Sequence, residues 1–386
     1  MDAAPQPRAR YERVVERIRA YALRHGVGAK IPSVRTLIRT CGVSQGIVMR
    51  AIADLEAQGM LERRPRSGVY IANGVGSPGR LVLLEPNIFV SPSSFFEILL
   101  SGLVDEVGRD RLDIRFAQSL RIGGPLTERD LLPAEVWGGL RANQFGSVLL
   151  CGTSAALVEH LHRMGVPCVA FATNGPNRVV LGYLEACQVG VGELARAGCR
   201  RIALYNTPYW SLREVFLASL RSHGLSETSI QNRRTFREQG EPGKAIQRFR
   251  LVEHGLAAAI QGFGPDVPPL QRPDGILSMD DMFTQGLLMG LDRLGIEPGR
   301  DVEIATYANR GSPSLAAWEG KLIRMVFDPR EIARAMHERA DSLERGVAES
   351  PGWAPAEETE RFGTENVYLL RPSVEVKSWS SELLPA

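Results

Sequence analysis

The chain has 386 residues, of which 44% are hydrophobic and 23% charged. This length suits two or three domains, and the composition excludes extended disorder. The net charge of +2 is uneven, because residues 1–73 carry 13 Lys/Arg against 6 Asp/Glu and the remainder carries 33 against 38. A basic N-terminal part on a mildly acidic remainder is typical of a nucleic-acid-binding domain joined to another domain.

Targeting and metal-binding patterns are missing from the sequence. It has no apolar run of about 20 residues and no signal-peptide pattern, so we expect a cytoplasmic protein without a membrane segment. The odd number of cysteines and their wide spacing argue against disulfides and a zinc site. Without a Gly-x-Ser-x-Gly or phosphate-loop motif, we expect neither an enzyme nor a cofactor or metal. The cysteines are Cys41, Cys151, Cys168, Cys187 and Cys199.

The N-terminal part predicts three helices. An amphipathic helix extends to about His25, and a second covers about 34–41, with Ser33 as its expected cap. Gly42 breaks the helical pattern, and Ser44 opens a third helix that ends at Gly59. A helix, a tight glycine turn and a helix form the helix-turn-helix pattern. The buried stripe of the third helix is expected to be Val48, Ala51, Ile52 and Leu55.

Two short strand-like runs follow, at 60–63 and 69–71, around a tip that contains Arg, Pro, Ser and Gly. These two runs resemble the winged helix-turn-helix of GntR-family transcription regulators, together with the segments Pro32-Ser33-Val34-Arg35-Thr36-Leu37 and Cys41-Gly42-Val43-Ser44. The resemblance extends over Ala9 to Asn73. The chain departs from the family at Gln45, where arginine is frequent, and in the following Gly46 to Met49. The resemblance therefore implies a double-stranded DNA operator but does not carry over the family's preferred bases.

Candidate DNA contacts lie on the second helix, the exposed face of the third helix and the hairpin. A glutamine can pair with adenine, and arginines reach guanine or phosphate. The alternative for each arginine is a solvated surface group, and Met49 packs equally well on its own helix. The candidates are Arg35, Ser44, Gln45, Gly46, Met49, Arg50, Arg64, Arg66 and Gly68.

Residues 74–79 form a Gly-rich linker, which predicts domains at 1–73 and 80–386. From Arg80 onward, apolar strand-like runs alternate with helical patterns, as in parallel sheets covered on both faces. About 300 residues of this pattern exceed one such sheet, so we expect two α/β lobes.

Several segments of this second part resemble LacI-type regulators. They are 193–204, 211–225, Pro273-Asp274-Gly275-Ile276-Leu277-Ser278-Met279-Asp280-Asp281, 301–307 and 326–329. The resemblance implies a periplasmic-binding-protein-like (type 1) fold with two lobes, three crossovers and a ligand cleft. The fold class expected for the whole chain is thus α/β with a small α+β head, the head being the winged helix-turn-helix.

Ligands in such folds bind at the carboxyl ends of the strands. The resemblance assigns ligand contacts to Arg213 and Asp281. Two alternatives remain open, namely that Phe95 belongs to the core and that Asp281 only caps its helix. The family's usual carboxylate is missing from the turn Tyr307-Ala308-Asn309. The candidate ligand residues are Asn87, Phe89, Phe95, Arg213, Asp281 and Asn309.

These features predict a dimeric, ligand-responsive transcription regulator, expected to be a repressor, with a sugar or sugar derivative as effector. A dimer is expected because one winged head covers only a half-site. Three alternatives stay open: a purine- or nucleoside-responsive regulator of the same architecture, an enzyme-like α/β body, and an architectural DNA-binding protein whose second domain binds no ligand.

Overall fold

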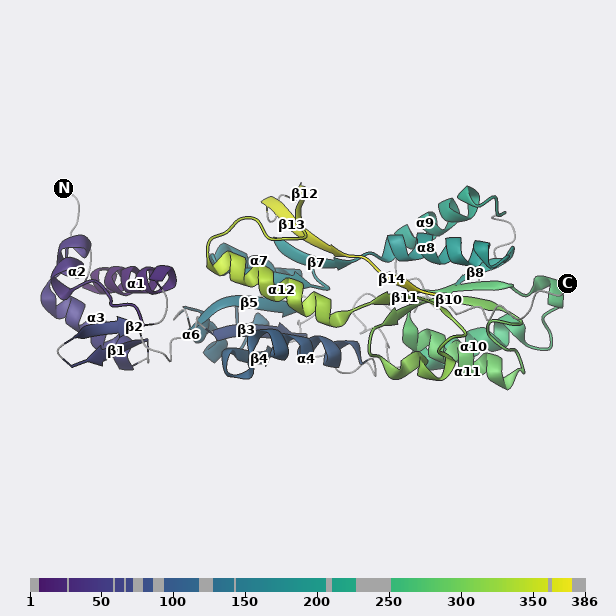
Figure 1. The fold of residues 1–386 in the computed structure, drawn as a ribbon, viewed down its shortest axis with the longest axis horizontal. Coiled ribbons are helices and arrows are strands. Elements are labelled where there is room, and N and C mark those ends of the chain that lie inside the picture. Colours follow the sequence, from purple (N-terminus) through teal and green to yellow (C-terminus); the bar gives the residue numbers. More distant parts are fainter. Residues whose placement is uncertain are drawn as a thin grey trace.

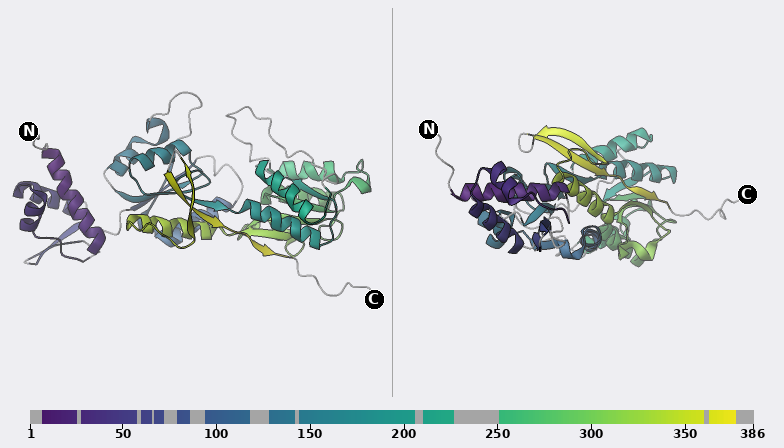
Figure 2. Two further views of the ribbon diagram at one scale, coloured as in Figure 1. Left: turned by 90° about the horizontal axis from the view of Figure 1, so that it is seen from above. Right: turned by 60° about the vertical axis from the view of Figure 1, so that its left-hand side comes forward.

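The structure is a computed structural model that describes residues 7–25, 28–57, 60–65, 67–71, 79–85, 94–117, 128–141, 144–205, 210–226, 251–359 and 363–376. Figure 1 shows an N-terminal head at one end of an elongated molecule and two larger sheets, each with its helices, along the rest. The left view of Figure 2 shows the seven-stranded sheet between the head and the five-stranded sheet.

The head has the predicted three helices and hairpin. Ser33 caps the second helix as predicted, because its hydroxyl accepts a hydrogen bond from the Thr36 amide at 3.2 Å. Gly42 ends this helix in the left-handed conformation (φ 64°), which glycine adopts without a Cβ penalty. The predicted stripe of the third helix is buried, from Val48 to Leu55. The elements are α1 (Pro7–His25), α2 (Val34–Cys41), α3 (Gln45–Ala57), β1 (Leu61–Arg64) and β2 (Gly68–Ile71).

The seven-stranded sheet has the order β12-β13-β7-β6-β5-β3-β4, and all its pairings are parallel except that of β12 with β13. Helices α4 and α12 cover one face of it and α6 and α7 the other, so its central strands are apolar on both sides. The strands are β3 (Gly79–Leu84), β4 (Leu112–Phe116), β5 (Phe145–Cys151), β6 (Cys168–Phe171), β7 (Asn177–Leu181), β12 (Trp353–Thr359) and β13 (Gly363–Leu370). The helices are α4 (Phe95–Val107), α5 (Glu128–Leu131), α6 (Ala134–Arg141), α7 (Ala155–Arg163) and α12 (Pro329–Glu344).

The five-stranded sheet has the order β14-β11-β10-β9-β8, with only β14 antiparallel to its neighbour. Helices α8 and α9 pack on one face, and α10 and α11 pack on the other. The strands are β8 (Ile202–Tyr205), β9 (Gly275–Ser278), β10 (Glu303–Asn309), β11 (Ile323–Phe327) and β14 (Ser373–Glu375). The helices are α8 (Tyr183–Arg196), α9 (Trp210–Ser222), α10 (Leu251–Phe263) and α11 (Asp281–Arg293).

The chain passes between the two sheets three times: from β7 to α8, from β11 to α12 and from β13 to β14. This agrees with the three crossovers that the resemblance implies. Strands β7, β12 and β13 were not predicted. Strand β7 escaped prediction because its alternating burial, with Asn177 and Arg178 at its start, is unlike the continuous apolar runs of its neighbours.

Candidate DNA-binding and ligand-binding sites

Most of the described residues that were predicted to bind DNA are exposed. At the start of α3, Ser44, Gln45 and Gly46 are exposed, and a Cβ at Gly46 would meet no atom within 4 Å. Met49 is half-buried, in keeping with the alternative that it packs within the head. Arg35 is exposed on α2. The amino end of α3 therefore offers two small residues and one amide side chain to a surface that can enter a groove.

Several arginines of the head already have acidic partners. Arg63 donates two hydrogen bonds to the Glu56 carboxylate, both at 3.1 Å. Arg64 donates to Glu62 at 2.7 Å. Arg50 lies 3.8 Å from Asp54, and its side chain is 79% exposed. Among the described residues, Arg35 has no such ion pair. The predicted contact Arg66 lies outside the described residues.

Strand β2 also carries an aromatic residue between two cations. The Arg64 guanidinium lies 4.4 Å from the centroid of the Tyr70 ring, and the Lys30 ammonium lies 5.9 Å from it. The Tyr70 hydroxyl forms a hydrogen bond of 2.5 Å with Ser67. At Gly68 the backbone has a φ of 122°, and a Cβ there would lie 2.7 Å from Cε of Lys30. Its backbone conformation thus requires a glycine at position 68, and the lysine side chain passes over it.

In the five-stranded sheet, a buried polar cluster stands at the carboxyl ends of β9 and β10. The Asp281 side chain, 3% exposed, accepts hydrogen bonds from Asn309 Nδ2 at 3.1 Å and from the Ser312 hydroxyl at 3.3 Å. Asn309 in turn accepts a hydrogen bond from the Tyr307 hydroxyl. Burial raises the pKa of Asp281, and these hydrogen bonds act against that rise.

The alternative that Asp281 caps its helix is wrong. The cap of α11 is Asp280, whose carboxylate accepts a hydrogen bond from the Phe283 amide at 2.8 Å. Asp281 is the first residue of α11, and its carboxylate joins the helix to the loop after β10. The two predicted ligand residues Asp281 and Asn309 are therefore brought together.

The other predicted ligand residues lie in different surroundings. Phe95 is buried in the hydrophobic core and stacks on Phe171 with ring centroids 5.5 Å apart, as the core alternative predicts. Arg213 is exposed on α9. Asn87 and Phe89 lie outside the described residues.

Sequence reasoning did not identify three aromatic residues near the crossovers. Tyr307 stacks on Tyr183, the first residue of α8, and on Phe327, the last residue of β11, at 5.7 and 5.2 Å between ring centroids, and Tyr183 lies 5.9 Å from Phe327. Burial raises the pKa of Tyr307 well above its ordinary value. A signal was available for Tyr183, which opens a helix, and for Phe327, which ends a strand, whereas Tyr307 lies inside β10, two residues before its end.

Two buried hydroxyl groups, one just after β5 and one just before α4, were also missed. Thr153, which follows β5, is 4% exposed, and its Oγ1 has no hydrogen-bond partner among the described residues. The Ser94 hydroxyl, just before α4, is likewise buried without such a partner. Unsatisfied buried hydroxyl groups are costly, so each is a position where an added ligand or water can bind.

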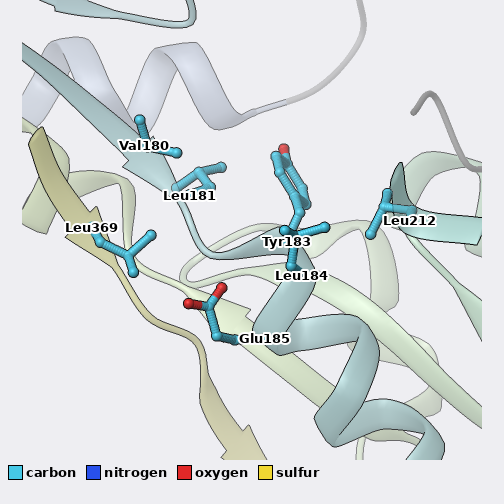
Figure 3. A pocket seen from close by; sticks show the side chains of 7 residues that line it. All are labelled: Val180, Leu181, Tyr183, Leu184, Glu185, Leu212 and Leu369. Carbon is cyan, nitrogen blue, oxygen red and sulfur yellow. The ribbon is translucent and has the colours of Figure 1, made fainter. Parts of the chain in front are cut away.

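Figure 3 shows a pocket of about 280 Å³ beside the first crossover. Its walls are mainly apolar and come from the end of β7, the start of α8, Leu212 of α9 and Leu369 of β13. Tyr183 belongs both to this pocket and to the aromatic stack with Tyr307. The pocket does not include Asp281 or Asn309, so the polar cluster and this pocket are separate features joined by Tyr183.

Within the described ranges, no cluster of three or more His, Cys, Asp or Glu residues has the arrangement of a metal site. In the same part of the chain, none of the helices combines the length and apolar character that crossing a membrane requires.

Comparisons with known proteins separate the head from the rest. Residues 10–71 match the family model "Bacterial regulatory proteins, gntR family". No curated protein sequence matches the chain.

The remainder is similar in structure to LacI-family regulators. A regulatory protein of the LacI family from Chloroflexus aggregans has 19% identity and a TM-score of 0.53, covering 78% of this chain and 97% of that one. A LacI family transcriptional regulator from Enterococcus faecium with bound ribose has 15% identity and a TM-score of 0.53, covering 79% and 100%. The regulator CCPA from Weissella paramesenteroides with bound glucose has 16% identity and a TM-score of 0.54, covering 78% and 96%. The chain thus carries a GntR-family helix-turn-helix domain at residues 10–71, joined to a part with the fold of LacI-family regulators.

Proposed function

We propose that the chain is a cytoplasmic transcriptional repressor that binds a double-stranded DNA operator through its head and a sugar-like effector between its two α/β lobes. The observation that carries the proposal is the joining of a GntR-type head to a LacI-type fold. Two of the structural neighbours hold ribose and glucose, which supports a sugar-like effector. The domains proposed are 1–73, the linker 74–79 and 80–386.

On the DNA side, α3 enters the major groove, and α2 and the hairpin contact the backbone. The exposed amino end of α3 supports this arrangement. The residues proposed to contact DNA are Arg35, Ser44, Gln45, Gly46, Met49, Arg50, Arg64, Arg66 and Gly68.

On the effector side, the buried Asp281–Asn309 pair is the centre of the proposed site. Hydroxyl-rich ligands suit a carboxylate, an amide and buried hydroxyl groups, because each sugar hydroxyl both donates and accepts. Asp281 already accepts bonds from Asn309 and Ser312, so effector binding exchanges some of these hydrogen bonds rather than filling an empty carboxylate. The residues proposed to contact the effector are Asn87, Phe89, Arg213, Asp281 and Asn309, whereas Phe95 packs in the core.

The proposal includes a homodimer that binds a two-fold operator. Two groups of exposed apolar side chains support it. Ile114 and Phe116 lie on the edge strand β4 and are 39% and 52% exposed. Ile260 and Met289 lie on α10 and α11 and are 51% and 36% exposed. Apolar groups of this kind frequently mark protein interfaces.

A thermal-shift screen of the full chain against ribose, glucose, sugar acids, nucleosides and purines tests the effector. A ligand at a hundred times its Kd stabilises the folded state by about 2.7 kcal/mol. Asp281→Ala should abolish the shift, whereas Asp301→Ala, at an exposed surface ion pair before β10, should preserve it. A shift with purines alone would replace the sugar by the purine alternative, and no shift with any class would refute the effector proposal.

The control of DNA binding is tested with labelled duplexes from the region upstream of the gene. The full chain should bind one of them more tightly than a random duplex, and the effector found by the screen should weaken that binding. Equal affinity for all duplexes would contradict the proposed operator, and tighter binding with effector would reverse the direction of control.

A further inference from the structure

The strand-like segment before α2 extends the hairpin into a three-stranded arrangement. The Gly28 amide donates to the Ile71 carbonyl at 2.9 Å, the Ile71 amide donates to Ala29 at 2.9 Å, and the Ile31 amide donates to Val69 at 3.0 Å. Lys30 and Tyr70 are thereby direct neighbours across an antiparallel bridge. The segment that leads into α2 is thus hydrogen-bonded to β2.

One face of this arrangement is polar and faces solvent. Tyr70 stands between Lys30 on one side and Glu62 on the other, and Arg64 is paired with Gly68 in the next row. Since side chains alternate along a strand, Leu61 and Ile71 lie on the opposite face, and both are buried in the core of the head. The polar face is therefore the one turned away from the core of the head.

The Lys30 side chain passes over Gly68 of the hairpin. Because a Cβ at Gly68 would lie 2.7 Å from Cε of Lys30 and 3.3 Å from its Nζ, the lysine side chain passes over the missing side chain of this residue. Its ammonium ends 5.9 Å from the Tyr70 ring centroid, on a ring that also holds the Arg64 guanidinium. Lys30 is exposed and, among the described residues, has no carboxylate partner.

The two cations on the ring are not equivalent. Arg64 is neutralised locally by Glu62, to which it donates at 2.7 Å. Lys30 lies next to this second cation and, among the described residues, forms no ion pair with a carboxylate. A phosphate placed beside Lys30 would relieve this imbalance, whereas a phosphate at Arg64 must compete with Glu62.

We infer that Lys30 is a DNA-backbone contact of the head and that Tyr70 and Gly68 are positioning residues that hold its ammonium over the hairpin. This inference rests on the proposed DNA-binding function and adds a contact that the helix-turn-helix pattern does not contain. The ligand it names is a phosphate of duplex DNA, bound without regard to base sequence.

The experiment measures the salt dependence of binding of the full chain to a fluorescent 30-base-pair duplex of random sequence, which requires no knowledge of the operator. Each phosphate contact contributes about 0.9 to the slope of log affinity against log salt. Lys30→Gln should therefore reduce the magnitude of the slope by about 0.9. The matched control is Arg63→Gln, which removes one positive charge from the same head but from a bidentate pair with Glu56. Its slope should change by less than half as much.

The positioning residues need a separate readout. Tyr70→Leu keeps every charge but removes the ring beside the Lys30 ammonium, and it should therefore weaken binding at low salt. Adding Lys30→Gln to Tyr70→Leu should then reduce the affinity by less than Lys30→Gln does alone. Lys30→Arg should restore part of the slope. Circular dichroism and the melting temperature of each variant show whether the head is folded.

Three outcomes separate the possibilities. If the wild-type chain does not bind the duplex at any salt concentration, the proposed DNA-binding function fails together with the inference. If the wild-type chain binds but Lys30→Gln leaves the slope unchanged, only the inference is overturned. If Lys30→Gln and Arg63→Gln reduce the slope equally, the effect is one of net charge, and Lys30 has no special contact.

Discussion

Replacing Arg80 with methionine should destabilise the lobe that contains β3, because this arginine is 1% exposed and joins three elements. It donates to the Ser147 hydroxyl at 2.9 Å, to Asp341 at 2.7 Å and to Glu344 at 2.8 Å. Its other terminal nitrogen contacts the ring and the carbonyl of His337. The arginine therefore fastens the first strand after the linker to the last turns of α12.

The magnitude follows from what the substitution leaves behind. Methionine keeps the aliphatic packing but removes the charged partner of the Glu344 carboxylate, whose side chain is only 10% exposed and keeps the Ser147 hydroxyl as a donor. Removing one partner of a buried pair costs about 3–5 kcal/mol, because the remaining charge stays buried. Asp341 adds little to this cost, since its side chain is 38% exposed and water can hydrate it. We therefore expect the lower end of the range, about 3 kcal/mol.

Urea unfolding followed by tryptophan fluorescence measures this effect, because residues 1–73 contain no tryptophan and the signal comes from the rest of the chain. With a slope of roughly 3 kcal/mol per molar urea, the midpoint should fall by about 1 M. Arg115→Met is the matched control, since Arg115 forms an ion pair with Asp113 on the neighbouring strand β4 but is 53% exposed. Its effect should stay below about 1 kcal/mol.

A double variant tests the cause. If the loss of the charged partner of Glu344 is responsible, Arg80→Met combined with Glu344→Met should recover part of the lost stability. The reasoning is refuted if Arg80→Met costs no more than Arg115→Met, because the cluster would then be hydrated in solution despite its burial.

Three further predictions concern other buried groups. Burial and the charge of Arg80 lower the pKa of His337 in the folded chain, so the unfolded chain is protonated first as the pH drops below about 6.5, and the free energy of unfolding should fall. Urea unfolding of His337→Gln should show a smaller decrease in the free energy of unfolding over the same pH range. A Cβ at Gly286 would lie 1.8 Å from the Val252 carbonyl oxygen, so Gly286→Ala should lower the melting temperature by the equivalent of at least about 1–3 kcal/mol, whereas Gly138→Ala, with nothing within 4 Å, should not. Burial raises the pKa of three thiols to about 12, so they should resist Ellman's reagent at pH 8 until the chain is unfolded; rapid labelling of the folded chain at these positions would contradict their burial. These thiols belong to Cys151, Cys168 and Cys187.

The sequence predicted the head well because local signals determine it. Ser33 and Gly42 cap α2, and both are recognisable from residue type and helical spacing alone. The continuous apolar runs of β3, β5 and β9 likewise identified buried parallel strands. In contrast, the Arg80 cluster joins residues separated by 67 to 264 positions, so no local pattern contains it.

Asp281 shows why the candidate effector site could be located but not described from the sequence. Two adjacent aspartates follow β9, and either satisfies the local rule for a helix cap; the structure assigns the cap to Asp280. That choice leaves Asp281 buried, where its carboxylate needs donors, and these come from Asn309 and Ser312, 28 and 31 positions away. Asn309 stands where the LacI-type resemblance implies a carboxylate. Its side-chain amide instead donates to the carboxylate of Asp281, at the end of the neighbouring strand. Because burial raises the pKa of Asp281, keeping it charged costs folding free energy, and a residue that opposes stability in this way is a stronger candidate for function than one that only packs.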